Sequence, residues 1–319
     1  TTGVVMLAQG TRMNTELLSN GGFELGLAGW DENYSVPGDA YNYQHRTGSY
    51  SRYCTNSNAT LVVNGRSGFV GVYTNEMTLL PGTYHLEAYV RHAESSSTTG
   101  AFNAAYNDFY IGVCNDTTSR LNSYLKFKSV VANADYAFQF NNAADAWKKI
   151  ECNFTLTESL TGRVFIGRTT SSTNLSYFFL DDVSLQLTAA GDLTDETLYT
   201  EAAEVTNAHS TTLTGLKPQT TYSYYVVSAA GCKSNIRTFT TSASTDPVTI
   251  TANPNPVNIT GPLGKTVTVA VSVSTENAYS QVVVSTGTCS DGRIKVTPTS
   301  LPADGGMVTL AFTDRKSVV

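Results

Sequence analysis

One strand-like stretch of this sequence places a carboxylate among apolar residues. Asp181 lies in "YFFLDDVSLQL" (177–187) and has the strand parity of Phe179 and Val183. Because alternate side chains of a strand share one face, we expect Asp181 to face the core and Asp182 to point outward. A buried carboxylate is costly unless a cation, an arginine or a proton compensates its charge. Asp181 is therefore a candidate for an ion site, and a turn-capping hydrogen bond is the plainer role.

A second carboxylate lies in a glycine-rich stretch near the start of the chain. Glu24 follows paired glycines in "LLSNGGFELGLAGW" (17–30). Each glycine costs a helix about 1 kcal/mol relative to alanine, so we expect a strand, a tight turn and a second strand start. For Trp30, as for Trp147 further along, core packing is a better expectation than a sugar platform.

A third group of residues has the composition of a sugar-binding face. Alternation in "GTYHLEAYVRH" (82–92) sets an apolar side against a side with His85, Glu87, Tyr89 and Arg91. The C–H faces of sugars stack on aromatic rings, while their hydroxyls need placed polar groups. Three further tyrosines could extend this face, although each could equally be a core or edge residue: Tyr41, Tyr43 and Tyr110.

Motifs of catalysis are absent from the sequence. It contains no G-x-S-x-G, no H-E-x-x-H and no carboxylate pair spaced along one strand as a glycosidase needs. A Ser/His/Asp triad that assembles only in space stays open. We predict no catalytic residues and a protein that is not an enzyme.

Composition indicates an all-β protein of several domains. The 319 residues exceed one ordinary domain, 41% are hydrophobic and only 14% are charged. Period-two alternation recurs along the chain, and turn signals such as "LPGTY" separate the strands. The net charge of −6 argues against nucleic-acid binding, and no run of eighteen apolar residues predicts a membrane span.

Shifts in composition divide the chain near residues 188 and 246. Residues 1–12 with "VVMLA" could be an extra strand or the remnant of a secretion signal. We expect the main domain at 13–188, a short domain at 189–245, and a last domain at 246–319. The ending "DRKSVV" looks abrupt, as if the last domain were truncated.

Five landmarks in order give the main domain a family resemblance. They are "LLSNGGFELGLAGW", "RTGSYS", "PGTYHLEAYVR", "AWKKIECNFTL" and "YFFLDDVSL". Together they resemble the jelly-roll carbohydrate-binding modules of the family four, nine and twenty-two type. The second domain, with "TTLTGLKPQTTYSYYVVSAAG", looks like the later half of a fibronectin type III domain whose first strands are missing or divergent, and residues 1–12 could supply one of them. The third resembles immunoglobulin-like spacers of secreted multidomain bacterial proteins. These resemblances imply a jelly-roll β-sandwich followed by two small β-sandwiches.

The resemblance also implies a cofactor. Jelly rolls of this type hold a structural calcium ion with the glutamate of the first strand and the aspartate of the last, which here are Glu24 and Asp181. Calcium takes six to eight oxygen ligands, and glycine-rich backbone lets carbonyl groups approach an ion.

The five cysteines are far apart and form no zinc motif. Their odd number leaves at least one thiol outside any internal disulfide, and all of them could be plain buried thiols.

The resemblance implies a secreted or cell-surface protein whose jelly roll binds a glycan or polysaccharide while the other domains act as spacers. The alternatives are an adhesion or structural protein with protein partners, and the non-catalytic front part of a larger hydrolase.

Overall fold

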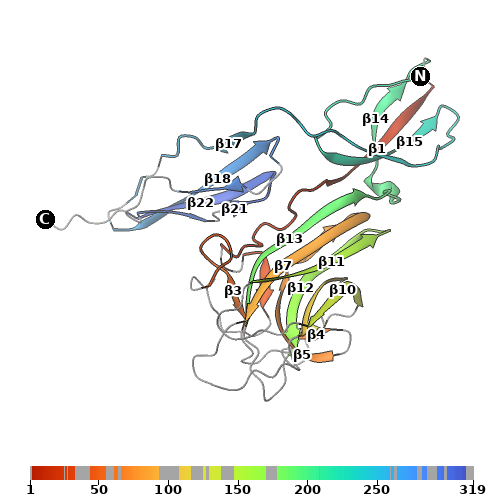
Figure 1. The fold of residues 1–319 in the computed structure, drawn as a ribbon. Coiled ribbons are helices and arrows are strands. Elements are labelled where there is room, and N and C mark those ends of the chain that lie inside the picture. Colours follow the sequence, from red (N-terminus) through yellow and green to blue (C-terminus); the bar gives the residue numbers. More distant parts are fainter. Residues whose placement is uncertain are drawn as a thin grey trace.

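A computed structural model gives the fold of this chain. The structure describes the following residues: 2–24, 26, 28–32, 44–54, 61–63, 66–92, 108–115, 125–126, 129–137, 147–169, 178–207, 209–258, 260–261, 264–278, 282–285, 293–297 and 300–313. The predicted all-β class is confirmed, because antiparallel sheets make up the architecture (Figure 1). None of the helices in the described part has the length and apolarity to cross a lipid bilayer.

Two sheets form a large sandwich in the middle of the chain. The smaller sheet has the order β11 (Lys148–Leu156), β7 (Gly82–His92), β13 (Phe178–Ala190) and β3 (Arg52–Cys54). The larger sheet has the order β10 (Ser129–Ala137), β8 (Asp108–Asn115), β12 (Leu160–Thr169), β5 (Arg66–Thr74), β4 (Leu61–Val63) and β9 (Leu125–Lys126). Two short strands extend it, β2 (Trp30–Glu32) on β5 and β6 (Met77–Leu79) on β12.

Strand alternation fills the space between these sheets. The even-numbered residues of β7 from Tyr84 to Val90 are fully buried in the main core cluster. Trp30 belongs to the same cluster, and its indole Nε1–H donates to the carbonyl oxygen of Asn20 at 3.0 Å. The odd-numbered residues of β7 therefore lie on the outer face of the smaller sheet.

The first strand of the chain belongs to a different sheet. β1 (Gly3–Arg12) lies between β14 (Thr200–Val205) and β15 (Thr220–Ser228), and β16 (Arg237–Thr240) completes this second sheet. Figure 1 shows the red β1 between these two later strands. Between β13 and β14 the chain forms one short 3₁₀ turn, η2 (Glu196–Leu198). The large sandwich is thus inserted between the first and second strands of the second sheet.

The two ends of the inserted sandwich lie side by side, where the chain leaves the second sheet after β1 and returns to it after β13. Met13 pairs with Leu187 in an isolated parallel bridge, and the backbone N–H of Asn14 donates to the Leu187 carbonyl at 2.8 Å. Within the second sheet, the hydroxyl oxygen of Tyr222 accepts the backbone N–H of Lys217 at 2.8 Å. This bond fixes the turn before β15 to the strand itself.

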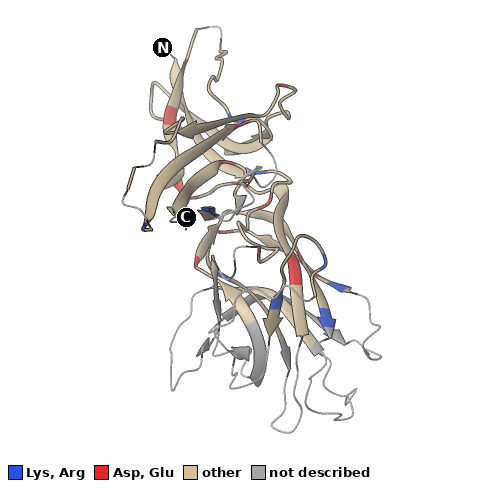
Figure 2. Cartoon of the chain, turned by 90° about the vertical axis from the view of Figure 1, so that its left-hand side faces the viewer, with Lys and Arg blue, Asp and Glu red and all other residues tan. Residues whose placement is uncertain are grey.

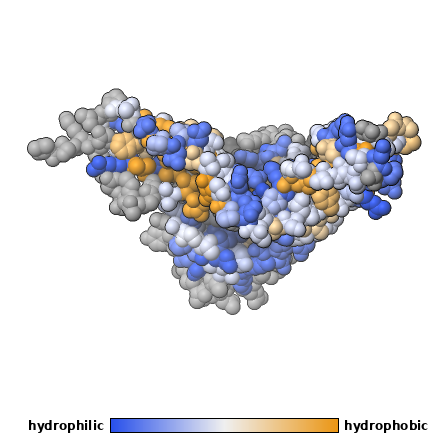
Figure 3. Space-filling model, turned by 90° about the horizontal axis from the view of Figure 1, so that it is seen from above, coloured by the Kyte–Doolittle hydropathy of each residue, from blue (hydrophilic) through white to orange (hydrophobic). Residues whose placement is uncertain are grey.

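A third group of strands follows residue 246. One sheet has the order β17 (Thr249–Asn253), β18 (Thr266–Glu276), β22 (Gly305–Thr313) and β20 (Ile294–Thr297), and β19 (Val282–Val283) pairs with β21 (Ser300–Leu301). Apolar residues gather on this part, at the left of Figure 3. Its exposed large apolar side chains are Val248, Ile250, Val283 and Met307.

Arg12 at the end of β1 contacts the third part directly. Its guanidinium donates to the carbonyl oxygen of Ala278 at 2.6 Å and forms an ion pair with Asp304 at 3.0 Å. The end of the first strand is therefore tied to the last third of the chain.

Candidate functional site

A β-bulge in β13 shapes the candidate ion site. Asp181 pairs with Tyr89 of β7, and the next regular pair is Ser184 with Glu87, so two residues of β13 lie opposite one residue of β7 and β13 contains one extra residue. Within the bulge, Asp182 has a left-handed backbone with φ of 48°. The bulge inverts the strand parity, which is why Leu180 and Val183 both point into the core.

Asp181 is buried, but on a different face from the one that its sequence parity indicates. It is fully buried, as expected, yet it shares a cross-strand pair with Tyr89 and therefore lies on the outer face of the sheet. The expectation of a core-facing side chain was wrong, because the parity argument ignored the bulge. The segment 44–51 covers this carboxylate: Oδ2 accepts the backbone N–H groups of Arg46 at 2.7 Å and Thr47 at 3.4 Å.

Glu24 holds the same segment at its other end. Its Oε1 accepts the backbone N–H groups of Ser49 and Tyr50, both at 2.8 Å. Gly48, which directly precedes these two residues, has φ of 64°, and a Cβ there would lie 2.2 Å from Glu24 Oε1. Only glycine combines this conformation with this close approach. The two predicted metal ligands, Asp181 and Glu24, thus accept hydrogen bonds from the backbone of the same short segment, 44–51.

The paired glycines explain how the carboxylates meet. Gly21 packs so closely on β13 that a Cβ would lie 1.8 Å from the Val183 carbonyl oxygen. A Cβ on Gly22 would instead be 3.9 Å from Asp181 Oδ1, from Asp182 Oδ1 and from Glu24 Cγ. The space in front of Gly22 is therefore bordered by three acidic side chains.

Asp182 is a residue of the candidate ion site that sequence reasoning missed. It was expected to point outward, and its carboxylate contacts the segment that covers the outer face: Oδ1 accepts the Thr47 hydroxyl and Oδ2 pairs with the Arg46 guanidinium at 2.7 Å. No described cation contacts Asp181 itself. When all three carboxylates are ionised, they and the one guanidinium have a net charge of −2. One divalent cation would neutralise this charge.

Burial raises the pKa of Asp181 to about 7, and the charge of Asp182 adds to the increase, although three backbone N–H groups act against it. Since this pKa lies above the ordinary value of 3.8, the folded state takes up a proton that the unfolded state releases. The stabilising contribution is complete below pH 4 and is lost as the pH rises through 7. Ionised Asp181 then costs on the order of 4 kcal/mol.

We therefore expect the metal-free protein to become more stable when the pH is lowered from 8 to 5. The measurement is denaturant unfolding of the large sandwich in the presence of a chelator. Asp181→Asn is the control, because it removes this titration and leaves that of His85, whose pKa is also raised. An equal pH response of the parent and Asp181→Asn would contradict the assignment.

The candidate sugar-binding face begins beside this site. Tyr89 lies on the outer face of the smaller sheet, half-buried. The guanidinium carbon of Arg46 lies 3.5 Å from the centroid of its ring. The ring is therefore already stacked on one side by a cation. Arg91 follows on the same face of β7, next to Phe179 of β13 across the strand pair.

The other end of the face is a charged cluster. Lys149 of β11 lies 2.6 Å from Glu87 and 2.8 Å from Glu151, and His85 bonds to Glu87 at 3.0 Å and to Asn153 at 2.6 Å. Although partial burial acts against it, bonding to Lys149 and His85 lowers the pKa of Glu87. Hydrogen bonds to Glu151 and Glu87 raise the pKa of Lys149.

This cluster also brings three metal-binding groups together. Ligand atoms of His85, Glu87 and Glu151 lie within 4.8 Å of one another. Lys149 lies between the two carboxylates, so each of them already has a positively charged partner without a metal ion. Among the described residues, the carboxylates around Gly22 form a more open set than this one.

Tyr110, a further predicted tyrosine, is not on this face. Tyr110 belongs to β8 of the larger sheet and is 4% exposed, and the main core cluster contains its neighbours Phe109 and Ile111 but not Tyr110 itself. Tyr41 and Tyr43 lie outside the described residues. The structure thus brings His85, Glu87, Tyr89 and Arg91 together and leaves Tyr110 on another sheet.

Arg46, Lys149 and Glu151 were not singled out from the sequence as site residues. The alternation of "WKKIECNFTL" could have indicated Lys149 and Glu151, since they share the outward parity of that strand. No local signal could have placed Arg46 on Tyr89, because that contact joins segments far apart in the sequence.

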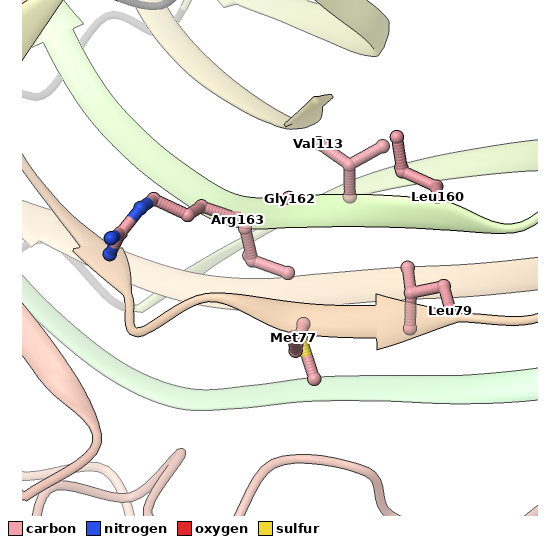
Figure 4. Close-up of a pocket in the computed structure, with 7 residues that line it drawn as sticks. Met77, Leu79, Val113, Leu160, Gly162 and Arg163 are labelled. Atoms are coloured by element: carbon pink, nitrogen blue, oxygen red, sulfur yellow. The ribbon is translucent and has the colours of Figure 1, made fainter. Parts of the chain in front are cut away.

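Charged side chains are otherwise sparse and scattered over the molecule (Figure 2). An apolar gap inside the sandwich, lined by Met77, Leu79, Val113 and Leu160, has no room for a water molecule. Figure 4 shows these side chains together, with the Arg163 guanidinium directed away from them. This gap is a packing feature.

Comparison with known proteins finds similar solved structures only. No family model and no curated protein matches the sequence. A structure described as Family 16 Carbohydrate Binding Module-2 is 18% identical with a TM-score of 0.31, covering 53% of this chain and 98% of its own. The K3 adhesin domain of Lys-gingipain from Porphyromonas gingivalis W83 is 18% identical with a TM-score of 0.33, covering 54% and 99%. The K1 domain of the same protein is 17% identical with a TM-score of 0.25, covering 52% and 95%.

Proposed function

We propose that the large sandwich binds a glycan on the outer face of β7, β11 and β13, without catalysis, in an extracytoplasmic protein. The observation that carries the proposal is the grouping of Tyr89 with His85, Glu87, Arg91 and Lys149 on one solvent-facing side of the sheet. A half-exposed aromatic ring beside donors and acceptors is the combination that a sugar ring requires.

The rigidity of this face supports the proposal. The polar side chains hold one another in place, with Lys149 between Glu87 and Glu151 and with His85 between Asn153 and Glu87. Binding to groups that are already ordered loses less conformational entropy than binding to mobile side chains. The strands beneath are fixed by the sandwich core.

Tyr89→Ala tests the site. We expect binding to weaken by about 1–3 kcal/mol, the range for loss of an interfacial aromatic contact, with little change in stability because the ring is partly exposed. The measurement is a glycan-array screen of the full chain followed by titration calorimetry on the best ligand. Tyr89→Phe keeps the ring and should bind like the parent.

Two results would count against this face. If Tyr89→Ala folds and binds as tightly as the parent, the glycan binds elsewhere. If no glycan on the array binds the parent protein, the proposed function itself fails.

We further propose that Glu24 and Asp181, together with Asp182, hold a structural calcium ion in front of Gly22. The support is the excess of two negative charges and the fully buried carboxylate of Asp181. When bound, the ion supplies charge compensation and no chemistry. Because the set is open, we expect the ion to draw the three carboxylates together and to hold segment 44–51 against the sheet.

A further inference from the structure

We propose that Arg46, stacked on Tyr89, makes the glycan site selective for sugars that carry a carboxylate or sulfate group. This inference rests on the proposed function and names the ligand class of the same site. Arg46 lies in segment 44–51 and not in a strand of the sheet, so the alternation of strand residues does not reveal it.

Arg46 is held in a fixed orientation. Its guanidinium carbon is 3.5 Å from the Tyr89 ring centroid, its Nη1 is 2.7 Å from Asp182 Oδ2, and its backbone N–H donates to Asp181 at 2.7 Å. The side chain is nevertheless 35% exposed. A guanidinium has five N–H donors in one plane, and the described residues accept only from Nη1. The remaining donors of Arg46 are available to a ligand.

The bonding of the basic side chains differs between the two ends of the face. At the far end, Lys149 is engaged by both Glu87 and Glu151. Near Tyr89, the Arg46 guanidinium contacts Asp182 through Nη1 alone among the described residues, and the fully buried Asp181 accepts the backbone N–H groups of Arg46 and Thr47.

A planar guanidinium with unused donors is complementary to an oxyanion, which it binds through two parallel hydrogen bonds. The sugar ring would lie along the outer face while its acidic substituent meets Arg46. A neutral sugar would leave those donors to water and gain nothing from them.

Affinity electrophoresis of the full chain tests this ligand class. The gels contain a uronate polymer before and after methyl esterification, or a sulfated galactan before and after desulfation. We expect retardation by at least one acidic polymer, none by its neutral form, and weaker retardation as salt is added. The two pairs distinguish a carboxylate from a sulfate ligand.

Variants then test Arg46 itself. Arg46→Gln should weaken binding about tenfold or more, and Arg46→Lys should also weaken it because the planar fork is lost. Arg237→Gln is the matched control, since it makes the same charge change at an exposed position of the second sheet. Unfolding midpoints of all three variants show that the fold persists.

The outcomes separate the inference from the function that it refines. Equal retardation by acidic and neutral forms, or parental binding by Arg46→Gln, overturns the inference while glycan binding stands. Retardation by no polymer, together with an empty glycan array, overturns both.

Discussion

Calcium is expected to raise the unfolding midpoint of the large sandwich, and a strong chelator is expected to lower it. An ion that binds only the folded state stabilises it by about 2.7 kcal/mol at a hundredfold excess over the dissociation constant. For a domain of this size, such a gain corresponds to a shift of about 5–10 °C. Differential scanning calorimetry with and without calcium measures it.

Variants test which carboxylate is needed for the stabilisation by calcium. Asp181→Asn should abolish the calcium response, because this residue places a buried charge directly beside the space in front of Gly22. Glu151→Gln is the matched control, since it removes a carboxylate from the cluster around Lys149 and not from the space in front of Gly22. Identical melting curves in calcium and in chelator, with no metal found by elemental analysis, would refute the ion.

Loss of β1 is expected to unfold the second sheet and spare the large sandwich. β1 is hydrogen-bonded to strands on both sides, and Ala8 is 1% exposed in the small core with Tyr199 and Tyr225. Ala8→Asp places an unpaired charge in that core, which should cost about 4 kcal/mol, more than such a small sheet is expected to tolerate.

Hydrogen exchange measures this effect strand by strand. In Ala8→Asp, the backbone amides of β15 should lose protection while those of β7 keep it. Gln9→Asp is the control, because Gln9 is the next residue on β1 and its side chain is exposed. Parental protection of β15 in Ala8→Asp would show that the second sheet does not depend on β1.

Strand alternation is the part of this molecule that sequence reasoning predicts well. The pattern in 82–92 gives the inward and outward faces of β7 correctly, since no bulge interrupts that strand before Val90. The same reasoning fails at Asp181, where the bulge inverts the parity and leaves no local sign in "FLDDVS". Asp181 is nevertheless buried, as predicted, but for a different reason: segment 44–51 covers it from outside the sandwich.

The features that could not be predicted from the sequence are contacts between segments far apart in the chain. The stacking of Arg46 on Tyr89 and the pairing of β1 with β14 join residues that no periodic pattern links. The N-terminal strand could be proposed as an extra element, but its central place in the second sheet depends on where the inserted sandwich returns the chain.

The inserted sandwich also has a consequence for the order of folding. Gly3 pairs with Val205, so an unfolded chain would have to close a loop of about 200 residues, at an entropic cost of about 5 kcal/mol beyond the constant term. Once the large sandwich has folded, Met13 and Leu187 are already neighbours, and β1 needs only a short search to find its partners. We expect the sandwich to fold first, with the second sheet forming in a later kinetic phase that slows if the sandwich is destabilised. During synthesis, β1 would leave the ribosome before the inserted sandwich and remain unpaired until nearly 200 further residues had followed it.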